Sequence, residues 1–196
     1  MHDADAVSGQ IVLSGARGDE LNFYIQAGNP RFQEITNVYD ESLSDAIESV
    51  FPLNTENAIL VWNHICVPLS YKYDISYMME DILQLLDKLQ NKEKGELRIN
   101  WLPDTFRCDW FIKWNTEEIK IQSRWECTVG DLENILNQRP NVELSKQVFI
   151  NEWKSVLGIV IEGLKGCGYS ENEIRHMDQL IERFESMKED GQLYKR

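Results

Sequence analysis

The sequence has no long apolar run, no basic leader and no paired cysteine motif. None of its apolar runs approaches the roughly 20 residues that a helix needs to cross a bilayer, so we expect no membrane partner. The first ten residues contain two acids but no Lys or Arg, unlike a signal or transit peptide. The four cysteines are far apart, which favours reduced thiols. We therefore expect a cytoplasmic protein in which Cys66 and Cys108, both in apolar surroundings, pack in the core.

Recognisable catalytic and ligand-binding motifs are also lacking. No Ser lies in a G-x-S-x-G elbow, and Gly15 and Gly18 lack the Gly-Lys-Ser/Thr ending of a phosphate loop. His64 and Cys66 would need distant residues to complete a zinc shell, so we expect no metal and no cofactor. The sequence predicts a protein that is not an enzyme. The alternative is an enzyme or small-ligand protein with a cleft near His64, between a sheet and a helix from Leu144, since distant acids could converge there.

Charge of one sign dominates the composition. The 196 residues include 33 acids and 20 Lys or Arg, and the net charge of -13 repels phosphate backbones, so we expect no nucleic-acid partner. Residues 1–90 hold 14 of the acids and only 4 bases. Between Arg31 and Lys72 there is no base, while six acids occur: Glu34, Asp40, Glu41, Asp45, Glu48 and Glu56. This stretch is either a solvated surface or a docking face for a basic partner.

The N-terminal part of the chain predicts a hairpin followed by a short acidic helix. Residues 11–13 and 21–26 are typical of strands, with Gly-rich turn residues between them. The helix begins at a cap, Ser42 or Ser44, and Pro52 ends it. Its spacing places four apolar residues on one face (Leu43, Ala46, Ile47 and Val50) and three acids on the other (Glu41, Asp45 and Glu48).

A buried strand and the longest predicted helix come next. Residues 58–62 are apolar, and we expect the strand to continue irregularly to Pro68. Asp74 can cap a helix that runs to about Lys94 and ends at Gly95. Its apolar stripe consists of Ile75, Met78, Met79, Ile82, Leu85, Leu86 and Leu89.

The strongest strand signal lies between residues 97 and 125. Apolar residues alternate there with period two, which places them on one face of an antiparallel sheet: Leu97, Ile99, Trp101, Trp110, Ile112, Trp114, Ile119, Ile121 and Trp125. The opposite face has mixed charge and is expected to be solvated. A sheet with one apolar face needs a cover, which amphipathic helices supply.

Those helices are predicted in the last third of the chain. Thr128 with Asp131, and Ser170 with Glu173, have the spacing of capping boxes for helices that end near residues 138 and 188. Between them, residues 144–165 have the spacing of one long amphipathic helix. We expect one α+β domain over residues 1–196, mainly antiparallel sheet covered by amphipathic helices. It comprises an N-terminal hairpin with an acidic segment (1–73) and a helix-sheet-helix core (74–196).

Aromatic residues divide into a core set and a surface set. The six tryptophans fall mostly in the strand pattern and are expected in the core. Residues 71–77 contain three tyrosines directly after the acid-only stretch, where a loop and a helix start leave side chains exposed. Aromatic anchors inside an acidic rim suit a basic protein partner. We therefore predict a partner-binding surface made of Glu34, Asp40, Glu41, Asp45, Glu48, Tyr71, Tyr73 and Tyr77.

Residues 75–165 carry a resemblance to a known class of proteins. A Leu-rich helix leads to the strands Leu-Arg-Ile-Asn-Trp101, Asp-Trp-Phe-Ile-Lys-Trp114 and Ile-Lys-Ile-Gln-Ser-Arg-Trp125, and then to helices. This small, acidic, Trp-rich chain resembles bacterial immunity proteins, which neutralise polymorphic or contact-dependent toxins. The resemblance implies a cytoplasmic inhibitor of one cognate toxin, often a basic nuclease. An inhibitor that mimics the charge of nucleic acid would use Asp40, Glu41, Asp45 and Glu48 in place of phosphates. A third class, a scaffold subunit, would be an obligate oligomer with a large apolar patch.

Overall fold

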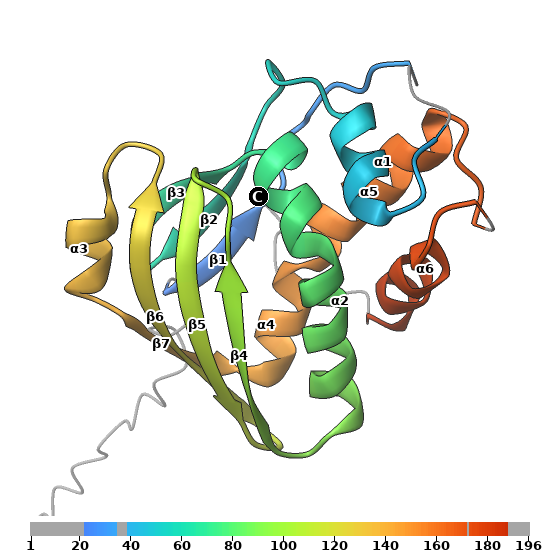
Figure 1. Ribbon diagram of the computed structural model, residues 1–196. Coiled ribbons are helices and arrows are strands. Elements are labelled where there is room, and N and C mark those ends of the chain that lie inside the picture. The colour runs from blue at the N-terminus through green and yellow to red at the C-terminus, as the bar shows by residue number, and fades with distance from the viewer. Residues whose placement is uncertain (1–21, 35–38, 172, 188–196) are drawn as a thin grey trace, which may run out of the picture.

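Two antiparallel sheets and a set of helices form the structure, a computed structural model that describes residues 22–34, 39–171 and 173–187 (Figure 1). This arrangement confirms the predicted α+β class. The three-stranded sheet has the order β1 (Phe23–Gln26), β2 (Ala58–Trp62), β3 (Ile65–Leu69). The four-stranded sheet has the order β4 (Gly95–Trp101), β5 (Phe106–Trp114), β6 (Glu118–Thr128), β7 (Asn141–Ser145).

The helices lie largely to one side of the four-stranded sheet. In Figure 1, α2 and α4 lie beside this sheet, and α1, α5 and α6 form a group beyond α2. No helix among the described residues is long and apolar enough to cross a membrane. The helical elements are α1 (Leu43–Val50), the π-helical turn η1 (Tyr71–Ile75), α2 (Ser76–Asn91), α3 (Glu133–Asn137), α4 (Lys146–Glu152), α5 (Lys154–Gly166) and α6 (Met177–Ser186).

The core is built around stacked and edge-on aromatic rings. All six tryptophans are at most 6% exposed, which confirms their predicted burial. The Trp110 ring on β5 lies 5.6 Å from that of Trp62 on β2, so the two sheets meet there. It also lies 6.3 Å from Phe23 and 5.3 Å from Trp101. One cluster of buried residues runs from Phe23 to Met187.

The predicted sheet pattern is confirmed in β4, β5 and β6. Eight of the nine alternating apolar residues are buried, and only Leu97 on β4 is half-buried. The opposite face is charged and exposed, as expected. It contains one exception, because Asp109 on β5 is fully buried beneath Arg98 and Arg124.

The predicted boundaries of the longest helix are wrong at both ends. Asp74 is not the cap, because Ser70 precedes the turn η1 and its hydroxyl accepts from the backbone of Tyr73. The carboxylate of Asp74 instead accepts from the backbone N–H of Ser70 at 2.7 Å. Gly95 does not end the helix but begins β4, directly beneath Trp114. A Cβ atom at Gly95 would overlap that ring, so glycine is required by close packing.

The single helix predicted over residues 144–165 is also wrong. Leu144 lies in β7, where Val142 and Leu144 alternate inward beside β6. The helical segment begins at Lys146 and is interrupted at Trp153, which separates α4 from α5. Apolar residues at positions 142 and 144 satisfy the strand period as well as a helix start, and pairing with β6 selects the strand.

Both predicted capping boxes differ from the structure. The Thr128 hydroxyl accepts from the backbone of Leu132 and donates to Glu133, so its carboxylate partner is Glu133 and not Asp131. Ser170 and Glu173 do bond, with 2.9 Å between the Ser170 N–H and the carboxylate. No helix follows at once, since the next residues bridge to the start of α1 and α6 begins only at Met177.

A tight turn joins β2 and β3, where irregular chain was predicted. Asn63 and His64 both have positive φ, 47° and 68°, as a two-residue hairpin turn requires. The strand period then directs Cys66 outward, so its predicted burial is wrong, whereas Cys108 is buried as predicted. Of the predicted N-terminal hairpin, residues 11–13 lie outside the described residues, and the described strand β1 pairs with β2.

Candidate protein-binding site

Two of the predicted tyrosines lie in a hollow beside the turn between β4 and β5. Tyr73 is 38% exposed, Tyr77 is 59% exposed, and Leu102 opposite them is 64% exposed. Exposed apolar side chains gathered at one place are typical of interaction sites. The hollow has a volume of about 450 Å³ and is lined by Tyr73, Tyr77, Leu102, Pro103, Asp104, Thr105 and Arg107.

A buried carboxylate ties the two walls of this hollow together. Asp74 is fully buried, and it accepts hydrogen bonds from the Thr105 hydroxyl on one wall and from the backbone of Ser70, the cap of the turn η1 that carries Tyr73 on the other wall. Burial raises the pKa of Asp74, and the bonds from Thr105 and Ser70 offset only part of that increase. The hollow is therefore positioned by a carboxylate whose ionised form is disfavoured.

This position leads to a prediction about pH. Because the pKa of Asp74 is raised in the folded state, the folded protein binds this proton more tightly than the unfolded chain does. The contribution of Asp74 to the free energy of unfolding should fall as pH rises from about 4, the unfolded value, through the folded pKa. Asp74→Asn keeps the shape and cannot ionise, so it should lose less stability than wild type between about pH 4 and pH 7.

Urea denaturation across this pH range measures the effect. The control is Asp104→Asn, which changes a carboxyl that lines the same hollow but has a side chain 84% exposed. Parallel pH curves for wild type and Asp74→Asn would contradict the assignment.

The predicted acids lie on and around α1. Glu34, Glu41 and Asp45 are exposed, whereas Asp40 and Glu48 are half-buried. Ser42 caps α1 as predicted, and its hydroxyl donates to Asp45 at 2.6 Å. The apolar face of α1 is fully buried, so its acids lie on the outward side, as its spacing predicts.

Asp40 is engaged within the fold. Its carboxylate accepts from the Tyr169 hydroxyl, which comes from the segment after α5. Burial and this carboxylate raise the pKa of Tyr169, so the hydroxyl stays protonated and continues to donate. Asp40 therefore holds the residues before α1 to the segment after α5, and the exposed acids carry more of any contact with a partner.

The acidic helix and the tyrosine hollow are neighbours in the fold. Helix α1 packs against η1 and α2, the elements that carry Tyr73 and Tyr77. The Lys72 amine donates to the Glu48 carbonyl at 2.6 Å and lies 5.9 Å from the centre of the Tyr73 ring. The structure thus brings two parts of the predicted surface together, and Lys72 joins them.

Tyr71 does not belong to this surface, and its predicted exposure is wrong. It is fully buried, its ring stacks on Phe51 with 4.6 Å between centres, and its hydroxyl donates to the Ala27 carbonyl at 2.7 Å. The turn η1 directs Tyr71 into the core and Tyr73 towards solvent. The spacing of the tyrosines in the sequence did not indicate this difference.

Sequence reasoning missed the wall formed by residues 102–107. Leu102 beside Pro103, between two strands, was a signal for an exposed turn with an apolar tip. Leu102 lies near Tyr77 because of the way α2 packs beside β4 and β5, and no local sequence pattern predicts that packing.

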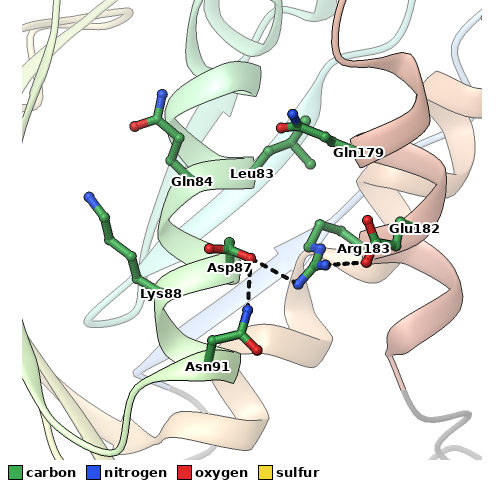
Figure 2. Close-up of a pocket in the computed structure, with 8 residues that line it drawn as sticks. All are labelled: Leu83, Gln84, Asp87, Lys88, Asn91, Gln179, Glu182 and Arg183. Atoms are coloured by element: carbon green, nitrogen blue, oxygen red, sulfur yellow. Dashed lines mark hydrogen bonds and ion pairs between the residues drawn. The ribbon is translucent and has the colours of Figure 1, made fainter.

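A second groove lies between α2 and α6 (Figure 2). It has a volume of about 520 Å³ and is lined by Leu83, Gln84, Asp87, Lys88, Asn91, Gln179, Glu182 and Arg183. Figure 2 shows Arg183 reaching across from α6 to Asp87, at 3.3 Å, while Asn91 bonds to the same carboxylate. Arg183 also bonds to Gln90 at 2.8 Å and is largely buried. The main polar groups of this groove are thus paired with each other, and they hold α6 against α2.

His64 and the metal-ligating residues do not assemble into a site in the described parts of the chain. His64 is exposed on the β2–β3 turn, and the helix predicted from Leu144 as the other wall of a cleft does not begin there. Within residues 22–34, 39–171 and 173–187, no three His, Cys, Asp or Glu residues are grouped to hold a metal ion. Comparison of the chain with protein-family models, with curated proteins and with solved structures finds no match.

Proposed function

We propose that this chain is a non-enzymatic inhibitor that binds a basic protein, and that it acts as an immunity protein against a cognate toxin domain. The observation that carries the protein-binding part is the exposure of Tyr73, Tyr77 and Leu102 around one hollow, next to a helix with acids on its outward side. Exposed aromatic side chains are the commonest anchors of protein interfaces.

The charge of this region supports a basic partner. Apart from the buried Asp74, residues 22–81 contain eight acids and two bases, Arg31 and Lys72. Such a surface attracts a positively charged protein and raises its association rate. The exposed acids Glu41 and Asp45, at the start of α1, then act on encounter. Tyr73 and Tyr77 supply the contact area that is desolvated on binding.

The toxin part of the proposal rests on the resemblance of residues 75–165 to immunity proteins and on the acidic surface. A nuclease domain binds a polyanion and therefore presents a basic active site. Exposed acids at the start of α1 would occupy such a site in place of phosphates: Glu41, directly before the cap Ser42, and Asp45 in the first turn.

Affinity capture from lysate of the source organism, followed by binding kinetics with the purified partner, tests this proposal. We expect Tyr77→Ala to raise the dissociation constant by about 30-fold, because the loss of an anchor residue weakens binding. The matched control is Phe111→Ala, which removes an exposed aromatic side chain from the outer face of β5.

Charge reversal tests the acidic helix separately. Asp45→Lys with Glu48→Lys should slow association by about tenfold at low salt, with a smaller effect at high salt. Glu118→Lys with Glu143→Lys, on the outer face of the four-stranded sheet, is the control of equal charge change. Unchanged association kinetics in the α1 variant would show that the acidic helix is not part of the interface.

Co-expression of this chain with the captured partner tests the toxin part of the proposal, and it should restore growth if that partner is a toxin.

A further inference from the structure

The outer edges of the two sheets are protected differently. On β1, the outward N–H of Ile25 donates to the Glu152 carboxylate at 2.8 Å. Pro68 removes an N–H from the middle of β3, and on β7 the carbonyl of Asn141 accepts from the Asn63 side chain at 2.9 Å. Each of these three edges therefore has a feature that interferes with a further strand.

On the fourth edge, β4, none of these three features occurs among the described residues, although α2 packs against this strand. Its seven residues run from Gly95 to Trp101 without a proline or a bulge. Among the described residues, the backbone of β4 is hydrogen-bonded only to β5. A long edge with free N–H and C=O groups is a template for another strand. Leu97, the one inward residue of the sheet pattern that is only half-buried, lies on this strand.

Charge around β4 also differs from that of the rest of the chain. The net charge of -13 makes copies of this protein repel each other over most of their surface. Residues 92–98, which lead into and form the first half of β4, hold three bases (Lys92, Lys94 and Arg98) and two acids (Glu93 and Glu96). The charge of this edge therefore does not add to the repulsion between two copies.

We propose that β4 pairs antiparallel with β4 of a second copy, around a two-fold axis at Leu97. Residues that face each other across such a pair have numbers that add up to twice that of the central residue. Glu96 of each copy then faces Arg98 of the other on the outer side, and the two Leu97 side chains meet on the inner side. The result is two cross-strand ion pairs and burial of the half-exposed Leu97.

Neighbouring registers are less favourable because of charge. A two-fold axis at Glu96 would place two glutamates opposite each other, and one at Arg98 would place two arginines opposite each other. Like charges directly opposite in a sheet are destabilising. An axis at Ile99 pairs Arg98 with Asn100 and forms no ion pair. The axis at Leu97 is the register in which the charged residues of β4 face opposite charges.

Sedimentation equilibrium of the full chain over a wide concentration range tests the pairing. We expect a reversible dimer, and we expect Glu96→Arg to raise its dissociation constant at least about tenfold, because two ion pairs become two repulsive pairs. Arg98→Glu should do the same alone. An equal mixture of the two variants should dimerise again, since positions 96 and 98 that face each other across the mixed pair then carry opposite charges. A chain that stays monomeric at all concentrations, or a dimer insensitive to both variants, would overturn the proposal.

Because Arg98 also contacts Asp109 and Glu96 also contacts Lys113 within one chain, a second measurement uses neither of these two variants. In a Cys66→Ser background, which removes the exposed thiol, Leu97→Cys places two identical thiols opposite each other at the axis. Mild oxidation should produce a covalent dimer, since facing Cα atoms in a sheet lie about 4.5–5.5 Å apart. Lys113→Cys, exposed on the neighbouring strand, is the control that should not cross-link. Equal cross-linking of both variants, or of neither, would contradict the register.

Discussion

Replacing Trp110 by alanine is expected to lower the free energy of unfolding by about 3–5 kcal/mol, the largest effect of any single substitution considered for this protein. Trp110 is fully buried on β5 and lies among the rings of Phe23, Trp62, Trp101 and Phe106. Its removal leaves a cavity where the two sheets meet. Both sheets anchor this cluster, so the surroundings cannot collapse easily into the space.

Urea or guanidinium denaturation followed by fluorescence and circular dichroism measures this loss. Phe111→Ala is the control, because the next residue along β5 points outward and is 41% exposed. We expect it to cost less than about 1 kcal/mol, as surface substitutions do. A loss of similar size in both variants would show that the cluster at Trp110 does not hold the sheets together.

Replacing Asp109 by alanine should have the second largest effect, and we expect it to lower the free energy of unfolding by about 2 kcal/mol near neutral pH. Asp109 is fully buried on the outer face of the sheet and accepts from Arg98, Asn100 and Arg124, at 3.0, 2.9 and 2.7 Å. Its removal eliminates four hydrogen bonds, two from Arg98 and one each from Asn100 and Arg124, and three of them are charge-assisted. They connect three adjacent strands. The arginines are more than half exposed and can be hydrated, which keeps the cost below that of a core cavity.

The cost of this substitution should depend on pH. Burial would raise the pKa of Asp109, but the hydrogen bonds from Asn100 and Arg98 and the charges of Arg98 and Arg124 outweigh it, so the pKa is lowered. A lowered carboxyl pKa contributes stability that is present above the unfolded value of about 3.9 and is lost as pH falls through the folded pKa. The difference between wild type and Asp109→Ala should therefore shrink in acid.

Chemical denaturation at several pH values gives this difference directly. Glu126→Ala is the matched control, since Glu126 also contacts Arg124, at 3.0 Å, but is itself 45% exposed. An exposed ion pair of this kind contributes about 0.5 kcal/mol or less. A difference for Asp109→Ala that stays constant down to strong acid would mean that packing and not its charge stabilises this position.

Patterns confined to one element were predictable because the physics that produces them is local. The alternation over residues 97–125 matches the pleat of a strand, so the inward side chains of β4, β5 and β6 follow from it directly. The amphipathic spacing and the Ser42 cap of α1 were readable for the same reason. Predictions failed where two periods fit the same residues, as at Leu144, or where a carboxylate had several possible partners, as at Asp74.

The binding surface divides in the same way. The sequence alone identified the acids in and around α1 and the tyrosines after them as candidate binding residues, because charge and aromatic content can be read directly from it. The structure separated Tyr71 from Tyr73, since the turn η1 buries one and exposes the other. It also supplied Leu102 and Arg107 as the opposite wall of the hollow.

By itself the sequence determined the α+β class, the buried face of the main sheet, the acidic helix and the excess of negative charge, because these depend on residue type and short-range spacing. The tertiary structure decided which exposed residues lie together, that Asp109 is buried on a solvated face, and that β4 lies at the edge of its sheet. Those features arise from contacts between segments far apart in the chain. The packing of the whole core selects such contacts, and no local preference encodes them.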